Sequence, residues 1–272
     1  MTKISALVMA SNEEAMLPGC LAMLGWADEI VVLVDDSTTD RSAEIARHHG
    51  ATVGVEPWRG FAAQRDRLAE LATGEWLLYV DADERITPSL AEEIRAATER
   101  SEAAIFAIPT RNVFLGKPMR DGGWWPDRHY RLIRRAAFRG WVGAIHETPA
   151  VDGMRAELRN PIVHLSHRSV RSMLLKTAAW SGVEGQRRAA TGKPVRARSL
   201  FGAVGHEVYF RLVRRRGWRD GMAGWIEVFY QAFSRFVSVA SAWEIQRTES
   251  LDETYRRLDE HLQSGGTLEG FK

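Results

Sequence analysis

The chain has little cysteine and no long apolar run at its start, and each shortage excludes a class of protein. Cys20 is the single cysteine among 272 residues, so an intramolecular disulfide framework is excluded and a reducing compartment is favoured. The apolar stretch at residues 4–10 is too short for a signal-peptide core, and Glu13 and Glu14 follow it. Internal repeats and low-complexity tracts are also missing from the sequence. We therefore expect a globular, cytoplasmic protein.

Net charge is small, but it is distributed unevenly. The formal charge of +2 arises from 37 Lys and Arg against 35 Asp and Glu. Residues 187–219, however, contain ten basic side chains and one acidic one, Glu207. Such a local excess indicates a surface for an anionic partner. A non-enzymatic binder of anionic lipid or nucleic acid through this segment is therefore an alternative function.

Strand-like and helix-like patterns alternate over residues 1–103, which predicts βαβ units and a largely parallel sheet. Ser11 and Asn12 have the side chains of helix caps. Thr87 and Pro88 predict the start of another helix. Residues 104–168 are strand-rich, and residues 169–247 have a mostly helical pattern with a break near 192–194. The predicted fold class is α/β, with flanking helices and a mostly helical C-terminal region.

Acidic residues follow two of the predicted strands. The run at residues 76–84, Trp-Leu-Leu-Tyr-Val-Asp-Ala-Asp-Glu, ends in Asp81 and Asp83, and the apolar strand at 30–34 ends at Asp35 and Asp36. The carboxyl ends of parallel strands border the ligand crevice of an open sheet. Asp81 and Asp83 could share a divalent cation with phosphate oxygens, although a surface turn is the simpler interpretation of the tripeptide alone. Asp35 and Asp36 could accept hydrogen bonds from a base and a ribose, or simply cap a turn.

Three further features carry candidate chemistry. Arg65 lies on the helix before the Asp81 strand and could reach a base or a diphosphate, although a solvated helix arginine is commoner. Glu147, beside His146 and after a Gly-containing turn, suits a positioned general base. The spacing of the histidines at 146, 164 and 167 matches no familiar zinc pattern. The Gly-Gly-Trp-Trp-Pro loop at 122–126 suits either sugar stacking or a structural plug.

Together these residues resemble the family 2 glycosyltransferases of bacteria, which have the GT-A fold. The matching segments are Ser11-Asn12-Glu13-Glu14, Asp35-Asp36-Ser37-Thr38-Thr39-Asp40, Gly60-Phe61 with Gln64-Arg65, Asp81-Ala82-Asp83-Glu84, Arg131-Leu132-Ile133-Arg134-Arg135 and His146-Glu147. Gly217-Trp218-Arg219-Asp220-Gly221 resembles an element of a subgroup that includes lipopolysaccharide inner-core glucosyltransferases. Ser37 departs from the family, since glycine usually holds this place, and it could alter the turn that shapes the ribose pocket.

The resemblance implies an inverting transferase. It would move a sugar from a nucleotide-diphosphate donor, with a UDP-sugar as the first choice, to a hydroxyl of a glycan or glycolipid. The reaction would belong to the synthesis of lipopolysaccharide core or another cell-envelope polysaccharide. The implied roles are donor binding by Ser11, Glu13, Asp35, Asp36, Arg65, Asp81 and Asp83, with Mg²⁺ or Mn²⁺ at Asp83, the catalytic base at Glu147, and acceptor-side positions at Trp124, Trp125, Arg131 and His146. No nucleic-acid partner is expected.

The resemblance also implies a domain division. Residues 1–168 would form a GT-A catalytic domain, with a donor half at 1–103 and an acceptor half at 104–168, and residues 169–272 would form the helical region. A sugar-nucleotide pyrophosphorylase is disfavoured because it would need a glycine-rich, basic loop after the first strand. A phosphatase or mutase would carry its Asp-x-Asp after the first strand and not after the fourth.

Residues 222–243 are rich in apolar side chains, but Glu227, Gln231 and Arg235 argue against a spanning helix. An amphipathic helix packed on the catalytic domain is one interpretation. The other is a helix at a membrane interface beside the basic segment, which would give peripheral contact with the inner face of the plasma membrane.

Overall fold

The computed structural model describes residues 2–143 and 147–271, and the chain divides into two compact units. The first unit is Met1–Arg168 with Gly217–Gly224, and the second is Ser169–Arg216 with Trp225–Lys272. The sequence placed a boundary at residue 168 but did not anticipate the return of 217–224 to the first unit. Asp220 explains this return, because its carboxylate accepts hydrogen bonds from the backbone amides of Arg120 (3.0 Å) and Asp121 (2.9 Å).

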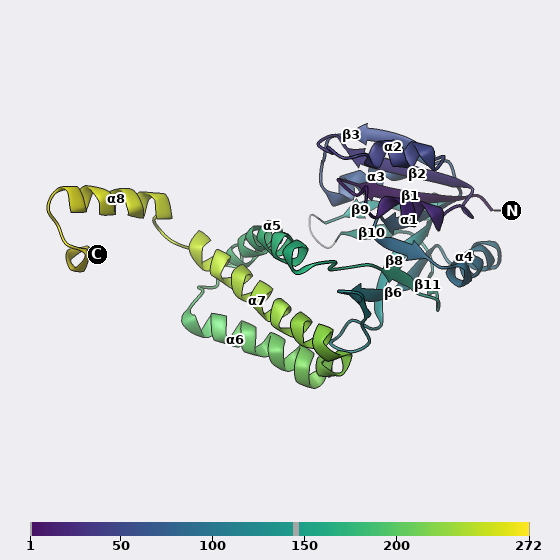
Figure 1. The fold of residues 1–272 in the computed structure, drawn as a ribbon. Coiled ribbons are helices and arrows are strands. Elements are labelled where there is room, and N and C mark those ends of the chain that lie inside the picture. Colours follow the sequence, from purple (N-terminus) through teal and green to yellow (C-terminus); the bar gives the residue numbers. More distant parts are fainter. Residues whose placement is uncertain (1, 144–146, 272) are drawn as a thin grey trace. The chain divides into compact units, whose positions relative to one another are not determined.

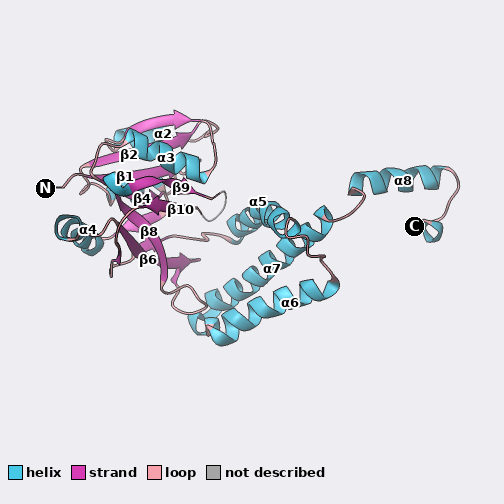
Figure 2. Cartoon of the chain, turned by 180° about the vertical axis from the view of Figure 1, so that it is seen from behind, coloured by secondary structure: helices cyan, strands magenta, loops and turns pink. Residues whose placement is uncertain are grey.

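The first unit contains the sheet (Figures 1 and 2). Its elements are β1 (Ile4–Ala10), α1 (Leu17–Ala22), β2 (Glu29–Asp35), α2 (Ser42–His48), β3 (Thr52–Glu56), α3 (Phe61–Leu71), β4 (Trp76–Asp81), β5 (Glu84–Ile86), α4 (Pro88–Arg100), β6 (Ile105–Phe114), β7 (Lys117–Pro118), β8 (Asp127–Arg134), η1 (Arg135–Ala137), β9 (Phe138–Val142), β10 (Thr148–Val151), β11 (Arg155–Glu157), β12 (Ile162–His164) and the 3₁₀ turn η3 (Gly217–Asp220).

The main sheet has the strand order β3-β2-β1-β4-β8-β6-β12-β5. β3, β2, β1 and β4 are parallel, and Val8 of β1 pairs with Val32 of β2 on one side and Val80 of β4 on the other. β8 is antiparallel to both β4 and β6, while β12 is parallel to β6 and antiparallel to β5. β9 and β10 form a separate antiparallel pair. Because the order reverses at β1, the ligand crevice of such a sheet lies beyond the carboxyl ends of β1 and β4.

Both faces of the central parallel strands β1 and β4 are buried, as is usual when helices cover a parallel sheet, whereas the edge strand β3 is partly exposed. Along β4, Trp76, Leu78 and Val80 join the core under α1 and α4, whereas Leu77 and Tyr79 join the core under α3. This alternation follows from the two-residue period of a strand. The expected α/β sheet with flanking helices is therefore confirmed.

One predicted helix start is wrong and another is confirmed. Ser11 and Asn12 do not cap a helix, since α1 begins at Leu17. Asn12 instead has φ of 54° and accepts the backbone N–H of Thr39 at 3.0 Å, so a bond between distant loops replaces the local cap. Thr87 does cap α4, and its side chain accepts the backbone N–H of Leu90.

The second unit is helical, as predicted. Its elements are α5 (Val170–Ala189), α6 (Ala197–Val208), the π-helical segment η2 (Tyr209–Arg214), most of α7 (Gly221–Ile245), α8 (Leu251–Gln263) and the 3₁₀ turn η4 (Leu268–Gly270). α5 and α7 approach closely at Gly185, where an added Cβ would lie 2.7 Å from Cβ of Ser241. Tyr230 fixes the same pair of helices by donating to the carbonyl of Met173 at 3.0 Å.

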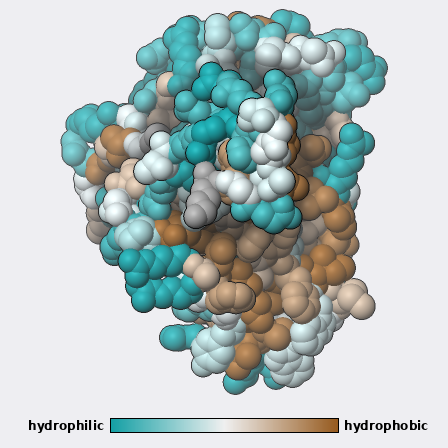
Figure 3. Space-filling model, turned by 90° about the vertical axis from the view of Figure 1, so that its left-hand side faces the viewer, coloured by the Kyte–Doolittle hydropathy of each residue, from teal (hydrophilic) through white to brown (hydrophobic). Residues whose placement is uncertain are grey.

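Apolar side chains gather on the surface over α6 and α7 (Figure 3). Even so, among the residues that the structure describes, no helix is long and apolar enough to cross a bilayer.

Candidate functional site

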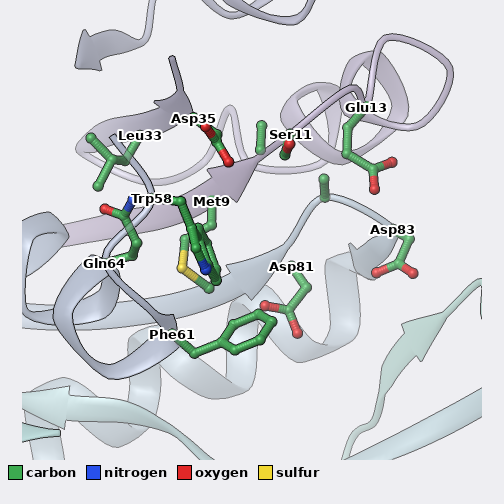
Figure 4. A pocket seen from close by; sticks show the side chains of 12 residues that line it. Met9, Ser11, Glu13, Leu33, Asp35, Trp58, Phe61, Gln64, Asp81 and Asp83 are labelled. Carbon is green, nitrogen blue, oxygen red and sulfur yellow. The ribbon is translucent and has the colours of Figure 1, made fainter. Parts of the chain in front are cut away.

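A pocket of about 380 Å³ opens at the carboxyl ends of β1, β2 and β4 (Figure 4). This volume lies in the usual range of small-molecule sites, roughly 300–1,000 Å³. The lining residues are Met9, Ala10, Ser11, Glu13, Leu33, Asp35, Trp58, Phe61, Gln64, Asp81, Ala82 and Asp83. The pocket therefore contains five of the seven predicted donor-binding residues: Ser11, Glu13, Asp35, Asp81 and Asp83.

The two ends of the pocket differ chemically. Rings of Trp58 and Phe61 lie edge to face at one end, with their centroids 4.7 Å apart. The carboxylates of Glu13 and Asp83 lie at the other end, and Asp81 lies between the two groups (Figure 4). An aromatic end suits a planar ring, and an acidic end suits a cation.

Two buried arginines hold Asp81. Arg131 Nη2 lies 2.8 Å from Asp81 Oδ2, and Arg65 Nη2 lies 3.3 Å from Oδ1. Burial raises the pKa of Asp81, but the two guanidinium charges outweigh this and hold the pKa well below its usual range. Asp81 is consequently ionised and fixed. Its backbone carbonyl also accepts the buried thiol of Cys20, at 3.6 Å.

Glu84 also belongs to the charged cluster that Asp81 forms with Arg65 and Arg131. Its side chain accepts the backbone N–H of Asp81 (2.8 Å) and the guanidinium of Arg131 (2.9 Å). Burial raises the pKa of Glu84, and the nearby Asp81 charge raises it further, against the lowering effect of Arg131. Arg131 was predicted on the acceptor side, but the structure buries its side chain beneath Asp81, with 8% of the residue exposed. Its contacts are those of a group that positions Asp81.

Arg65 links the pocket to Glu147. Its Nε donates to Glu147 Oε1 at 3.1 Å, while its Nη2 reaches Asp81. The guanidinium also lies over the rings of Trp141 (4.9 Å) and Tyr79 (5.8 Å), which fix its orientation. The solvated-arginine interpretation is therefore wrong here, because only 7% of Arg65 is exposed.

Asp83 contacts a histidine from a distant strand. Nε2 of His164, on β12, lies 3.2 Å from Asp83 Oδ2, and Nδ1 lies 2.7 Å from Oδ1 of Asn112 on β6. Antiparallel pairing of β12 with β5 aligns His164 with Glu84, and Leu165 N donates to the carbonyl of Asp83. Asn112 Oδ1 accepts the hydrogen bond of Nδ1–H, and Asp83 accepts that of Nε2–H. Burial lowers the pKa of His164, but the hydrogen bond to Asp83 and the charge of Asp83 outweigh it and raise the pKa. Loss of the Nε2 proton would free the lone pair of that nitrogen to bind a metal ion.

The residues at the acidic end fit a divalent cation. Burial raises the pKa of Glu13, and the charge of Asp83 raises it further, so these carboxylates repel each other across the end of the pocket. Within residues 2–143 and 147–271, no group of three or more His, Cys, Asp or Glu is arranged to hold a metal by itself. Asp83 and His164 would therefore supply part of the ligand set, and substrate phosphates the rest, as is usual for Mg²⁺.

The two acids after β2 have different positions. Asp35 lines the pocket, and its Oδ1 accepts the backbone N–H (2.9 Å) and hydroxyl (2.8 Å) of Ser37. The departure at Ser37 thus orients Asp35. Asp36 is exposed, and its backbone amide donates to the carbonyl of Glu56. A donor-binding role for Asp36 stays a prediction.

The two tryptophans of the loop at 122–126 differ in their exposure. Trp125 is 37% exposed, with the guanidinium of Arg111 at 4.8 Å over its ring. Trp124 is half-buried against His167, with 6.2 Å between ring centroids. Trp125 thus has the exposure that sugar stacking needs, and Trp124 is closer to a structural plug. His146, the remaining acceptor-side prediction, lies outside the described residues.

Sequence reasoning missed Trp58 as a lining residue, His164 as the neighbour of Asp83, and Trp141 as the platform of Arg65. Trp58 follows the third strand and His164 ends the last strand of the main sheet, so the rule that polar and aromatic residues after strands form the site could have found both. Trp141 lies within β9 and offered no such signal.

The sequence is similar to those of known glycosyltransferases. A family model described as Glycosyl transferase family 2 matches residues 5–151. The lipopolysaccharide core biosynthesis glycosyltransferase LpsC of Rhizobium meliloti (strain 1021) is 29% identical over 253 residues, covering 89% of this chain and 92% of that protein. An uncharacterized glycosyltransferase of Rickettsia bellii (strain RML369-C) is 24% identical over 256 residues, covering 89% and 87%.

A solved structure was also matched: glucosyl-3-phosphoglycerate synthase from Mycobacterium tuberculosis in complex with Mn²⁺, uridine diphosphate and glucosyl-3-phosphoglycerate. It aligns with a TM-score of 0.35 and 21% sequence identity, over 41% of this chain and 44% of that chain.

Proposed function

The chain belongs to glycosyl transferase family 2, and on that premise we propose that it transfers a sugar from a UDP-sugar to a hydroxyl group of a glycan or glycolipid, with inversion at the anomeric carbon. The observation that carries this proposal is the pocket at the strand ends, aromatic at one end and acidic at the other. A nucleoside diphosphate has the matching polarity, with a flat base at one end and a charged diphosphate at the other.

The aromatic end would receive the base. The ring of Trp58, 44% exposed, offers a stacking face, and Asp35 lies above it on the adjacent strand (Figure 4). Ser37 already holds one oxygen of Asp35, so the carboxylate is oriented before the donor arrives. An oriented carboxylate accepts a hydrogen bond from a uracil N–H or a ribose hydroxyl at a lower entropic cost.

The acidic end would receive the diphosphate with Mg²⁺ or Mn²⁺. Asp83 and His164 would hold the ion, which when bound supplies Lewis-acid stabilisation of the charge on the departing diphosphate. Asp81 cannot serve equally well, because its two oxygens are engaged by Arg65 and Arg131. Its fixed negative charge suits hydrogen bonding to donor hydroxyls.

Glu147 is the proposed catalytic base. Its carboxylate would take the proton of the acceptor hydroxyl while that oxygen attacks the anomeric carbon and the bond to the diphosphate breaks on the opposite face. Arg65 binds both Glu147 and Asp81, so one buried guanidinium joins the base to the donor pocket. A single displacement of this kind inverts the anomeric carbon and requires no covalent nucleophile.

The acceptor class is proposed from the relatives. LpsC, which aligns over 92% of its length, is described as a lipopolysaccharide core biosynthesis enzyme. We therefore assign the acceptor to lipopolysaccharide core or another cell-envelope glycan, made at the cytoplasmic side of the membrane. Trp125, exposed beside Arg111, is the proposed stacking platform for an acceptor sugar.

Calorimetric titration with UDP, with and without Mn²⁺, tests the donor site. Wild-type protein should bind UDP more tightly with Mn²⁺, and Asp83→Asn should lose that metal-dependent gain because it removes the carboxylate charge. The matched control is Glu92→Gln, an exposed acid on α4, which should bind like wild type. Incubation with radiolabelled UDP-sugars and lipopolysaccharide core acceptors then identifies the transferred sugar.

Each outcome discriminates between functions. Metal-dependent binding that is lost in Asp83→Asn supports the transferase. Failure to bind UDP under either condition removes the UDP assignment and directs the titration to other nucleotides. A non-enzymatic binder would retain its ligand in Asp83→Asn.

A further inference from the structure

Helix α7 has two apolar stripes, and its largest side chains lie on the outer one. The inner stripe contains Val228, Ala232, Val239 and Ala242, each at most 5% exposed. The outer stripe contains Trp225 (41%), Phe229 (59%), Phe233 (46%), Phe236 (44%) and Trp243 (49%). At 100° per residue these five positions fall within an arc of about 80° on one side of the helix.

This arrangement reverses that of an ordinary surface helix, which turns its large apolar residues inward and its charges outward. One acidic residue of α7 takes part in the reversal. Glu227 is 1% exposed and faces Arg211 of η2, with 3.8 Å between Oε1 and Nη1. Arg211 Nε in turn donates to Glu207 of α6 at 2.5 Å. A buried acidic residue of α7 is thus neutralised between the helices, on a side of α7 that lies away from the outer stripe.

Neighbouring elements extend the apolar surface (Figure 3). Phe201 of α6 is 79% exposed, and Tyr209 and Val213 of η2 are 59% and 56% exposed. Contiguous exposed apolar surface of this kind marks a site of interaction with a protein or a membrane. We call the set formed by α6, η2 and the outer stripe of α7 the aromatic face.

Exposed arginines adjoin the aromatic face. Arg214 is the last residue of η2, Arg215 and Arg216 follow it, and all three are exposed. The guanidinium of Arg215 lies over the ring of Phe210, 5.3 Å from the ring centroid, so a cation–π contact joins this charge to the aromatic residues of η2. Aromatic side chains together with arginines suit the boundary between anionic headgroups and acyl chains.

We propose that the aromatic face docks on the anionic surface of a lipid bilayer. Its phenylalanines and tryptophans would enter the headgroup region, and Arg214 to Arg216 would pair with lipid phosphates. Charge decides between this partner and a second copy of the chain. A symmetric dimer would bring both sets of arginines onto the same interface, where they would repel each other, whereas an anionic bilayer neutralises them.

Flotation of the full-length protein with vesicles tests the proposal. The protein should float with vesicles containing phosphatidylglycerol, more weakly with phosphatidylcholine alone, and less as salt increases. The double variant Phe229→Ser with Phe233→Ser should lower the partition coefficient about tenfold or more, since it removes two inserted rings. Arg214→Gln with Arg215→Gln should lower it roughly fivefold per charge.

The matched controls are exposed residues that do not belong to the aromatic face. Tyr255→Ser removes an aromatic ring that is 61% exposed on α8, and Arg100→Gln removes an exposed charge at the end of α4. Both should float like wild type. Quenching of tryptophan fluorescence by brominated lipid supplies a second readout, which Trp225→Phe with Trp243→Phe should abolish.

Light scattering separates the alternatives. Failure of the protein to float with vesicles overturns the proposal. If light scattering then shows a dimer that the Phe229→Ser and Phe233→Ser variant dissociates, the aromatic face is a dimer interface. Equal flotation with neutral and anionic vesicles overturns the assignment to an anionic surface. Circular dichroism confirms that each variant is folded, and UDP titration of the same samples shows independently whether the donor site is intact.

Discussion

The two units of this protein both bury charged side chains, but they place their large apolar side chains differently. In the first unit, leucines, valines and isoleucines fill both faces of the sheet, and the buried charges of Arg65, Glu84 and Arg131 gather beside the pocket. In the second unit, Glu207 and Glu227 are buried between helices and aromatic rings lie on the surface.

Buried charge therefore has a different effect in each of the two units. Beside the pocket it fixes Asp81 and Glu147 in position, where ligands arrive from water. Between α6 and α7 it keeps acids away from a surface that we propose to meet lipid. If the first unit binds a charged nucleotide and the second meets a bilayer, as we propose, the two units need different exteriors.

The largest expected effect comes from removing the proposed catalytic base, which should change the first unit alone. Glu147→Gln should lower kcat by about 10²- to 10⁴-fold, the usual cost of losing a general base. The amide oxygen can still accept from Arg65, so UDP binding and vesicle flotation should stay at wild-type levels. Steady-state transfer assays measure the loss, with Glu157→Gln, an exposed acid on β11, as the control. Retained activity would exclude Glu147 as the base.

The next effect is on the free energy of unfolding, and it tests whether the aromatic face is a surface or part of a core. Leu78→Ala, at a fully buried position of β4, should cost about 2–5 kcal/mol of unfolding free energy, because it leaves a cavity in the core. Phe229→Ser, on the aromatic face, should change it by no more than about 0.5 kcal/mol. Urea denaturation followed by circular dichroism measures both. A cost at Phe229 as large as that at Leu78 would mean that the aromatic face is part of a core.

A smaller effect is expected from Asn112. Asn112→Leu removes the acceptor of His164 Nδ1 and should weaken Mn²⁺ binding in the presence of UDP by about 10- to 100-fold. Asn112→Asp, which keeps an oxygen acceptor, should restore most of the affinity. Calorimetry measures both variants, and unchanged metal affinity in Asn112→Leu would show that His164 needs no positioning.

The smallest effect is a pH dependence in the first unit. Burial raises the pKa of Asp28, but hydrogen bonds from Arg95 and the amide of Ile4 outweigh it, so the folded-state pKa lies below the ordinary 3.8. The stabilisation is therefore present above pH 3.8 and is lost as pH falls through the lowered folded-state value. Asp28→Asn should flatten the acid side of the stability curve, whereas Asp252→Asn on α8 should not. Thermal melts across acidic pH provide the measurement.

Local pattern sufficed to predict the sheet and half of the site. Apolar runs that end in acids identify β2 and β4, so Asp35, Asp81 and Asp83 could be assigned to one edge of the sheet by their place after these strands. The helix start at Thr87 followed from its cap and Pro88 in the same way.

Contacts between distant segments could not be predicted. His164 reaches Asp83 across 81 residues only because β12 pairs with β5, a register that the sequence does not disclose. Arg131 was predicted on the acceptor side, and its burial beside Asp81 depends on neutralisation by Asp81 and Glu84. Asn12 accepts a hydrogen bond from the backbone of Thr39 and does not form the expected helix cap. In each case a tertiary contact outweighed the local preference.

The buried thiol of Cys20 gives the protein an intrinsic reporter. The residue is 1% exposed, its Sγ donates to the carbonyl of Asp81, and burial raises its pKa, so a thiol reagent can label it only when α1 separates from the end of β4. With one cysteine in the chain, every labelling event has the same origin. The labelling rate therefore counts openings beneath the pocket, and a nucleotide that closes the pocket should slow it.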